Sequence, residues 1–503
     1  MTMARESDTL EVEDSKKAVT VSRRAWFTLA ILSSTLLTVF FSETMLLPAI
    51  PEIIQDFKIP YGMAAWIFSA YLIVAAVMTP VAGRLSDLFG KKKVLLTLLI
   101  IYIAGLTAGG FADSISFLLI TRIIQGVGLA AVPAAFSLLR DTFPPAKLAI
   151  AIGVFGSAYS AGSVVGLLIG ASIIQNFGWH ATFLAIVPFS ALVTLMIARF
   201  VKENSELGQL STGAKASESI SNEKRETFSI DIKGVLALSV TITSFLIALT
   251  LIQIGVSSEN LPQIAAAFIT SAISLSVFVI IERRAIPPFF NLRLLRHRVL
   301  LPSYMLLIAT GITMFMIYPT IVQLVRSPEP LGFGGDSVDA ANVQLPFMIM
   351  FLIFAIITPF IINRIGSTKP SIIGGIISLF GALGLLTFHS TEFAVSANLA
   401  IIASGLSLTI TSTWNLVVSS SPKEFTGISV GVGALLLFIG MAIGPALAGV
   451  YMENHETVSG IEGSYPSSGS YNLVFLTSGL LSAVSVGFGL VLWRKVTHKA
   501  IEV

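Results

Sequence analysis

The chain contains fourteen long apolar runs, each of roughly 18–25 residues, separated by short polar breaks. An apolar helix of about 20 residues is long enough to cross the ~30 Å hydrocarbon core of a bilayer. Hydrophobic residues make up 54% of the 503 residues and charged residues only 12%, which excludes a soluble domain of this length. We therefore predict an all-α integral membrane protein with fourteen transmembrane helices.

Basic residues are distributed unevenly between the two sides of the predicted helices. All 31 Lys and Arg residues except Lys58, Arg122 and Arg326 fall in the tails and in the alternate loops of one side. Cytoplasmic loops collect Lys and Arg, so this side is predicted to be cytoplasmic. An even number of helices places both termini on that side. We expect a multi-pass protein of the cell (plasma) membrane with cytoplasmic N- and C-termini.

Two polar stretches divide the fourteen runs into groups of six, two and six. Stretches rich in Ser, Glu and Lys are typical of flexible linkers. We predict two pseudo-symmetric six-helix bundles with an inserted helix pair between them. The predicted segments are a cytoplasmic tail (1–25), the N-terminal bundle (26–200), a cytoplasmic linker (201–232), the inserted helices (233–281), a second linker (282–299), the C-terminal bundle (300–493) and a cytoplasmic tail (494–503).

Two motifs occur once in each predicted bundle, which indicates an internal duplication. Aligning Asp87 with Asn363 also aligns Gly90 with Gly366, in the loops after the second and tenth runs. Glycines repeat at nearly the same offset in the fifth and thirteenth runs: Gly153, Gly162, Gly166 and Gly170, then Gly431, Gly440 and Gly444. In proteins built from such repeats the substrate path lies between the two halves.

The loop between the second and third runs combines glycines, an aspartate and basic residues: Gly83, Arg84, Leu85, Asp87, Gly90, Lys91 and Lys92. This pattern resembles the loop signature of the major facilitator superfamily of membrane transporters. The resemblance implies a gating loop. Asp87 would bind a helix N-terminus or an arginine of a neighbouring helix, and would release it when the bundle rocks. A simple topology anchor is the alternative, because basic loops are common.

One arginine, Arg122, lies inside an apolar run, where an unpaired guanidinium is costly. Arg122 is therefore predicted to face the interior of the bundle. The segment from Arg122 to Ala130 resembles the motif of the fourth helix in the superfamily. We expect a role in proton coupling or substrate binding. The alternative is a structural arginine that hydrogen-bonds the backbone of helix 1.

The glycine spacing of the fifth run resembles the signature of drug–proton antiporters in the superfamily. Leu167 stands where that signature has a proline, whereas the thirteenth run keeps its proline, Pro445. Small residues four positions apart let two helices approach closely, so we interpret the glycines and Pro445 as a helix-packing motif. Whether Leu167 changes the mode of transport stays open.

Glu43 is the one carboxylate clearly inside an apolar run, and we expect it to meet Arg122 across the N-terminal bundle. Fourteen-helix antiporters of the superfamily usually carry an aspartate here; Ser42 takes its place and Glu43 follows. Burial favours the neutral form of a carboxyl group and a guanidinium favours the charged form, a balance that a proton carrier can switch. We predict that Glu43 and Arg122 couple transport to protons. The alternative is that Glu43 opens to water near the outer surface.

The pattern as a whole resembles the fourteen-helix drug:H⁺ antiporter branch, which includes tetracycline and multidrug efflux proteins. This resemblance implies a secondary active transporter that exports small amphipathic or cationic drugs in exchange for protons by alternating access. Uniport or import of a small metabolite is the alternative, because it would use the same loop motif. A membrane-embedded enzyme or receptor would need a catalytic constellation or a soluble module, and neither is visible.

The sequence shows no phosphate-binding glycine loop, no metal-ligand cluster and no cysteine. We therefore expect no enzyme activity, no metal and no cofactor, so that the proton gradient supplies the energy. The expected partners are a small-molecule substrate, protons and membrane lipid. The net charge of +3 reflects the basic loops, and we expect no nucleic-acid binding. We expect a monomer.

Overall fold

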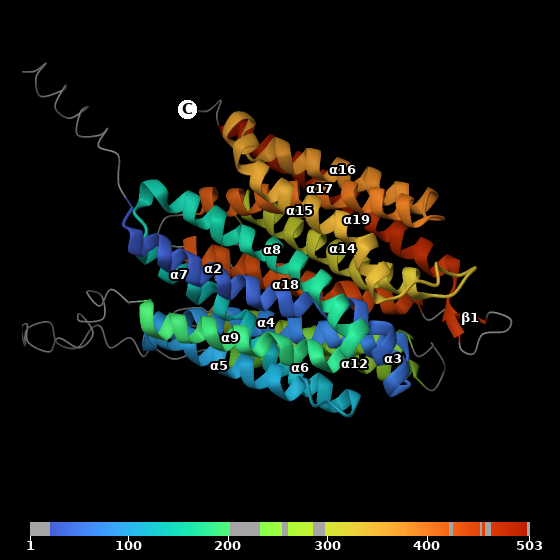
Figure 1. The fold of residues 1–503 in the computed structure, drawn as a ribbon. Helices are drawn as coiled ribbons and strands as arrows, with labels where there is room; N and C mark the ends of the chain where they lie inside the picture. The colour runs from blue at the N-terminus through green and yellow to red at the C-terminus, as the bar shows by residue number, and fades with distance from the viewer. Residues whose placement is uncertain are drawn as a thin grey trace, which may run out of the picture.

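The computed structural model describes residues 21–201, 232–253, 260–284, 297–421, 426–452, 455–457 and 464–499. Within these ranges the chain folds into long helices that run side by side along one axis (Figure 1). In the described part of the chain, fourteen helical stretches are long and apolar enough to cross a membrane. This count confirms the predicted number of spans and the all-α fold class. The first 20 residues and most of both predicted linkers lie outside the described residues.

Within residues 21–201, the first six spans are built from nine helices in chain order. They are α2 (Arg23–Thr44), the short 3-10 helix η1 (Leu47–Ala49), α3 (Ile50–Phe57), α4 (Tyr61–Phe89), α5 (Lys91–Gly109), α6 (Ile115–Leu129), α7 (Ala131–Thr142), α8 (Pro145–Phe177) and α9 (Trp179–Phe200). The next two spans are α11 (Ile232–Gln253) and α12 (Leu261–Arg284).

The last six spans are single long helices. They are α14 (Leu300–Arg326), α15 (Ser337–Ile365), α16 (Thr368–Thr387), α17 (Glu392–Ser420), α18 (Thr426–Met452) and α19 (Ser468–Lys499). A small antiparallel hairpin, β1 (His455–Thr457) and β2 (Ser464–Pro466), precedes α19 and was not predicted from the sequence.

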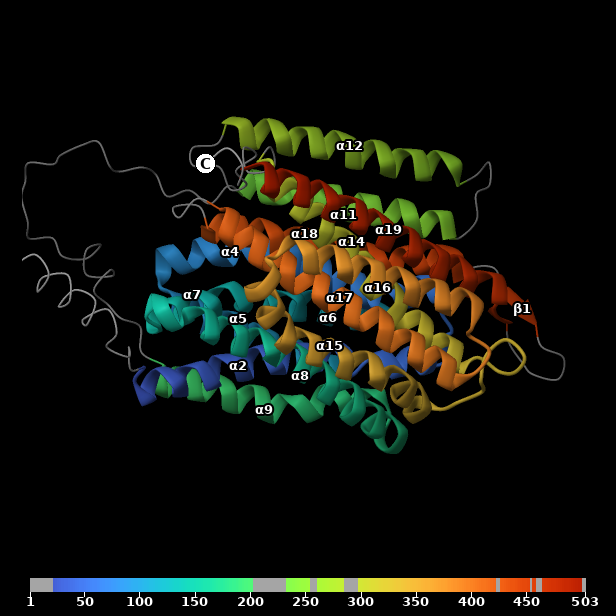
Figure 2. The same ribbon diagram turned by 90° about the horizontal axis from the view of Figure 1, so that it is seen from above.

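Helix α12 lies at the edge of the bundle (Figure 2). It packs mainly against α11, and α11 in turn contacts α4 and α18. The residues of α12 are largely exposed although the helix is strongly apolar. The pair that the sequence predicts to be inserted therefore sits outside the packed centre, where lipid would cover it.

Two spans are interrupted at prolines, which the sequence analysis did not predict. A proline has no N–H to donate to the carbonyl four residues earlier, and its ring clashes with that carbonyl. Helix α2 ends at Thr44, four residues before Pro48, and α6 ends at Leu129, four residues before Pro133. The first and fourth spans are therefore broken helices, and Glu43 lies beside the first break.

The internal repeat is visible in the backbone. Gly90 follows α4 directly with φ 96°, and Gly366 follows α15 directly with φ 79°. Positive φ of this kind is accessible almost only to glycine. Gly90 alone separates α4 from α5, and Gly366 with Ser367 separates α15 from α16, so in both halves the glycine makes a sharp corner into the next helix.

Substituting alanine for Gly366 should lower the free energy of unfolding by about 1–3 kcal/mol, because the Cβ is strained at this backbone conformation even though the space around it is open. A lower unfolding temperature of the detergent-purified protein would show this effect. Gly487→Ala in α19 is the matched control, since Gly487 is helical and its added Cβ would also meet open space. Equal unfolding temperatures for the two variants would contradict the prediction.

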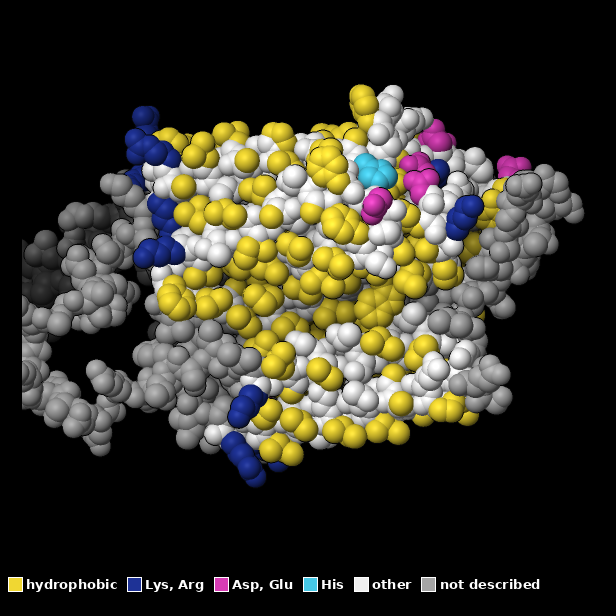
Figure 3. All heavy atoms as spheres, turned by 90° about the horizontal axis from the view of Figure 1, so that it is seen from below, with side chains coloured by type: hydrophobic (Ala, Val, Ile, Leu, Met, Phe, Trp, Pro, Cys, Tyr) yellow, Lys and Arg dark blue, Asp and Glu magenta, His cyan; other side chains and the backbone are white. Residues whose placement is uncertain are grey.

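Charged side chains separate along the bundle axis (Figure 3). Lys and Arg gather at one end, and most of the visible Asp and Glu lie at the other (Figure 3). We call the end where α2 begins the basic end. The opposite end, where α3, the end of α14 and β1 lie, is called the far end (Figure 1).

Candidate functional site

Glu43 is buried in the last turn of α2. Only 2% of its surface is exposed, and neither carboxyl oxygen has a hydrogen-bond partner. The alternative in which Glu43 opens to water is therefore wrong for this conformation. A buried ionisable side chain without a partner is costly, and within a membrane span such a residue usually serves a function.

Arg122 projects from α6 and is fully buried. Its Nε donates a hydrogen bond to the carbonyl of Ile67 at 3.0 Å, and its Nη1 donates to Oε1 of Gln125 at 2.8 Å. Its guanidinium carbon lies 4.2 Å from the ring centroid of Tyr71. Because Ile67 belongs to α4, the alternative that Arg122 bonds the backbone of helix 1 is wrong.

A buried polar cluster surrounds these two residues; we define it as Ser42, Glu43, Tyr71, Tyr102, Arg122 and Gln125. The Tyr102 hydroxyl donates to the Ser42 hydroxyl at 2.5 Å, which links α5 to α2. Gln125 donates through Nε2 to the carbonyl of Gly105 at 3.0 Å and so fixes its amide toward Arg122. The cluster thus joins four helices of the first six spans.

Glu43 and Arg122 form neither an ion pair nor a hydrogen bond with each other. Arg122 keeps one nitrogen, Nη2, without a partner, and the Tyr71 hydroxyl is also unpartnered. The sequence analysis placed both residues in one region, as the structure does, but expected them to meet. The cluster therefore holds unused donors and acceptors in the interior.

A second buried group, which we call the interhalf aromatic cluster, joins the first six spans to the last six. Its members are Phe40, Tyr159, Met314, Phe315, Tyr318, Phe347, Met348 and Phe351. The ring of Tyr159 lies 4.1 Å from Phe40 and 5.8 Å from Phe351, measured between centroids. Its hydroxyl lies 3.7 Å from the sulfur of Met314.

Tyr318 organises the part of this cluster that α14 and α15 contribute. Its ring lies 5.1 Å from that of Phe347, and its hydroxyl lies 3.8 Å from the sulfur of Met348. Phe40, which packs against Tyr159, lies in α2 three residues before Glu43. The two clusters therefore share helix α2, which contributes Phe40 to one and Ser42 and Glu43 to the other.

The glycines of the helix-packing motif face the neighbouring first helix of each half. A Cβ at Gly162 would collide with the carbonyl of Leu37, and one at Gly170 would lie 2.6 Å from Cα of Met45, both on the α2 side. In the second half, a Cβ at Gly444 would lie 2.7 Å from the carbonyl of Ile312 in α14. Gly440 approaches the Ile308 carbonyl in the same way.

Other motif residues make no such contact or cannot be described. A Cβ at Gly431 would meet nothing within 4 Å. Pro445 lies inside α18, and the helix continues through this proline. Helix α8, which carries Leu167 at the matching position, is also continuous there. Gly153 lies in α8, but its surroundings are outside the described part of the structure.

The predicted gating loop is the sharp corner between α4 and α5 at the basic end. Gly83 lies in the last turns of α4, Gly90 makes the corner, and Lys91 begins α5. The Lys92 ammonium donates to the carbonyl of Ala198 at 2.7 Å, which ties α5 to the end of α9. Arg84 and Asp87 lie in α4, but their side chains are outside the described residues, so the partner predicted for Asp87 is not tested.

Residues 32–445 match the family model of the Major Facilitator Superfamily. The chain belongs to this superfamily. It is therefore a multi-pass membrane transporter of small molecules, and the resemblance stated from the loop and helix motifs is confirmed.

Relatives in the superfamily carry names that refer to drug resistance. The chain is 27% identical over 447 residues to multidrug resistance protein 3 of Bacillus subtilis, covering 86% of this chain and 81% of that protein. It is 26% identical over 435 residues to the tetracenomycin C resistance and export protein of Streptomyces glaucescens, covering 85% and 76%.

A solved structure supports the fold. The crystal structure of the human organic anion transporter MFSD10 (TETRAN) matches with a TM-score of 0.62 at 14% identity, covering 93% of this chain and all of that chain. At this identity the likeness concerns the superfamily fold alone.

Several site residues escaped the sequence analysis. Tyr71, Tyr102 and Tyr159 read as ordinary aromatic residues in apolar runs, and nothing in their spacing links them to Glu43. Gln125 was part of the motif around Arg122 but received no role. The available signal was polarity: a glutamine and tyrosine hydroxyls in membrane spans need partners, and such partners gather in the interior.

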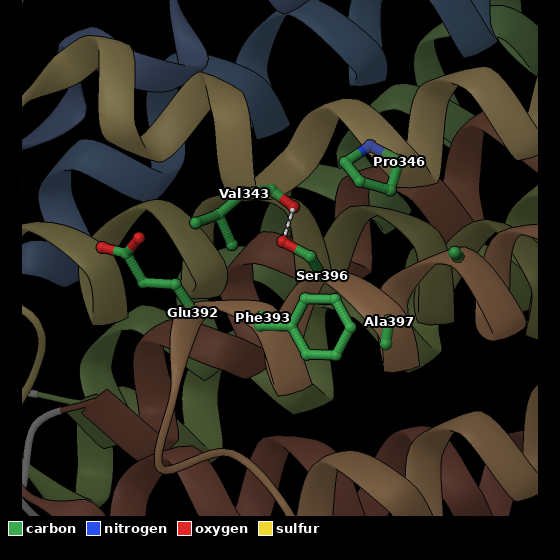
Figure 4. A pocket seen from close by; sticks show the side chains of 7 residues that line it. Val343, Pro346, Glu392, Phe393, Ser396 and Ala397 are labelled. Atoms are coloured by element: carbon green, nitrogen blue, oxygen red, sulfur yellow. Dashed lines mark hydrogen bonds between the residues drawn. The ribbon is translucent and has the colours of Figure 1, made fainter.

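A groove outside both clusters has a volume of about 470 Å³ and lies between α15 and α17 near the far end (Figure 4). It is lined by Val343, Pro346, Glu392, Phe393, Ser396, Ala397 and Ala400. The Ser396 hydroxyl donates to the Val343 carbonyl at 3.1 Å across it (Figure 4). Since none of its residues belongs to either cluster, we do not assign the groove to the transport site.

Among the described residues, no three His, Asp or Glu side chains lie close enough to hold a metal ion.

Proposed function

We propose that this transporter exports small amphipathic or cationic drugs in exchange for protons by alternating access. The observation that carries the proposal is the position of Glu43. It is a buried carboxyl group without a partner, one turn along α2 from Phe40 of the aromatic cluster that joins the two halves. The names of the relatives, which refer to multidrug resistance and antibiotic export, support the same substrate class.

The substrate binds at the interhalf aromatic cluster. Methionine side chains are flexible and polarisable, so Met314 and Met348 can adapt to compounds of different shape. The faces of Tyr159 and Phe351 offer cation–π contacts to a positively charged compound. Because helices of both halves supply the cluster, rocking of the halves would expose it to either side of the membrane.

Glu43 carries the coupled proton. An ionised carboxylate is far more costly to bury than a neutral carboxyl group, so occlusion of the site favours the protonated form. Opening to water, or the approach of the Arg122 guanidinium, favours release. A cationic substrate and a proton would compete for the same carboxyl group, which gives exchange without any cofactor.

The basic end faces the cytoplasm in this proposal, and the gating loop at Gly90 lies on that side. The separation of Lys and Arg along the bundle axis supports this orientation (Figure 3). The far end then faces the outside. The transporter would reside in the plasma membrane and draw its energy from the proton gradient.

Proton movement in inverted membrane vesicles tests the proposal. A pH gradient is imposed and followed with a fluorescent weak base while dyes, tetracyclines and quaternary ammonium compounds are added. We expect compound-dependent collapse of the gradient in vesicles that contain the protein and none in vesicles without it. If no compound collapses the gradient although vesicles still accumulate or release a labelled metabolite, uniport or import replaces the export assignment.

A further inference from the structure

Arg326 is one of three basic residues that depart from the one-sided distribution of Lys and Arg, and the structure gives it a partner. It is the last residue of α14, at the far end. Its Nη1 lies 3.0 Å from Oε1 of Glu52 in α3 and 3.1 Å from the carbonyl oxygen of Pro48. The side chains are 16% and 28% exposed, so the ion pair is partly shielded from water. It joins the first span to the first helix of the last six.

A second polar contact joins the halves near the same place. The Gln175 amide, close to the end of α8, donates to Oδ2 of Asp336 at 2.7 Å. Asp336 caps the N-terminus of α15, where its other oxygen accepts from the backbone N–H groups of Val338 and Asp339. The Ser337 hydroxyl also reaches the carbonyl of Ala171 in α8 at 3.5 Å.

The two contacts are mechanically linked by the turn that joins α14 to α15. Its backbone folds back onto the end of α14: the N–H of Gly334 donates to the Ser327 carbonyl at 2.8 Å, and the N–H of Gly335 donates to the Val325 carbonyl at 2.9 Å. Arg326 and Asp336 are therefore held on one compact unit. Any movement that separates this unit from α3 and α8 must break both contacts together.

We propose that Glu52, Arg326, Gln175 and Asp336 form a far-end latch that holds the two halves together and must open before the far end can open. The proposal rests on alternating access as stated under the proposed function. Glu52 lies on the short outer extension of the first span, where η1 and α3 continue the chain beyond the break that follows Glu43. Opening of the latch frees that extension and admits water toward Glu43.

The chain suits a direct test because it has no cysteine, so spin labels can be attached to introduced cysteines without a background. Gln55 in α3 and Ser468 at the start of α19 are both exposed and lie at the far end on opposite halves. Ser468 stays close to the latch unit because the nearby Tyr471 hydroxyl lies 3.0 Å from the Ser327 hydroxyl. The distance distribution of the Q55C/S468C pair therefore reports separation of the halves.

We expect Glu52→Gln and Arg326→Gln to raise the ratio of long to short distances about fivefold, since a partly exposed ion pair contributes up to about 1 kcal/mol. Arg326→Gln should shift the ratio at least as far as Glu52→Gln, because it also loses the bond to the Pro48 carbonyl. The double variant should shift it no further than Arg326→Gln alone, because both changes remove one contact. Gln175→Ala should add to either single change.

Lys58→Gln is the matched control, because Lys58 is a cation at the same end, directly after α3, that is exposed and forms none of these contacts. Arg326→Lys should keep the ratio close to that of the wild type and so shows that charge is the decisive property. An unchanged ratio of long to short distances in both single variants would overturn the latch. A shift in Lys58→Gln as large as that in Arg326→Gln would also overturn it, and so would a double variant in which the shifts of the two single variants add. Since no compound or proton gradient is used, a failed flux experiment would reject the proposed function without affecting this result.

Discussion

Replacing Glu43 with glutamine is expected to reduce compound-driven proton movement to the level of vesicles that lack the protein. Glutamine has nearly the same shape as glutamate, so the packing of α2 should survive, but it cannot bind and release a proton. Binding of an uncharged compound should persist, because the interhalf aromatic cluster is untouched. The pH-gradient assay measures compound-driven proton movement, and quenching of fluorescence by a bound dye measures binding.

Glu392→Gln is the control for the loss of a carboxylate as such. Glu392 lies in the first turn of α17, outside both clusters, and its replacement should leave proton movement unchanged. Glu43→Asp should retain part of the activity, because the shorter side chain still titrates. If Glu43→Gln collapses the gradient as well as the wild type does, antiport would stand but the proton would have to travel on another group.

The helices could be predicted from the sequence because bilayer thickness imposes a length on every span. The corners at Gly90 and Gly366 were also recognisable, since a repeated motif implies a repeated backbone conformation. The breaks after Thr44 and Leu129 were missed. Prolines are common in membrane helices, and the neighbouring sequence does not decide whether a helix continues or ends at one. Helix α14 continues through Pro319, whereas α2 ends before Pro48.

The candidate site was predicted only in part for a related reason. Glu43 and Arg122 stood out because charge inside an apolar run is rare. Their partners are contributed by other helices, so that Tyr102 becomes relevant only once α5 reaches α2, and Gln125 only once α6 packs against α5. The aromatic cluster could not be predicted from the sequence. Phe, Tyr and Met at helical spacing give the same sequence pattern whether they face another helix or face lipid.

The repeat also shows how the two halves have diverged. The spacing that relates Leu37 to Ile308, each opposite a motif glycine, also relates Glu43 to Met314. At equivalent places the first half therefore carries a carboxyl group and the second a methionine that contacts Tyr159. Within the proposed mechanism, the first half therefore binds the proton through Glu43, and the second half offers the substrate a flexible apolar side chain, Met314.

Substituting alanine for Gly166 should destabilise the protein by about 1–3 kcal/mol and sharply reduce transport. The added Cβ would lie 2.5 Å from the carbonyl oxygen of Phe41 and would also collide with the Thr44 hydroxyl. That hydroxyl donates to the Ser163 carbonyl at 3.0 Å, so α2 and α8 are joined at this point by a hydrogen bond as well as by close packing. Because Glu43 is the neighbour of Thr44, moving α2 away from α8 also displaces the proton site.

Gly156→Ala is the matched control, on the same helix α8 but at an exposed position where a Cβ would meet nothing within 4 Å. It should leave the unfolding temperature and transport close to those of the wild type. The comparison separates loss of close packing from the general effect of removing a glycine from a helix. If both variants lose the same stability and the same transport, the contact between α2 and α8 is not what makes Gly166 necessary, and the helix-packing interpretation of the motif fails with it.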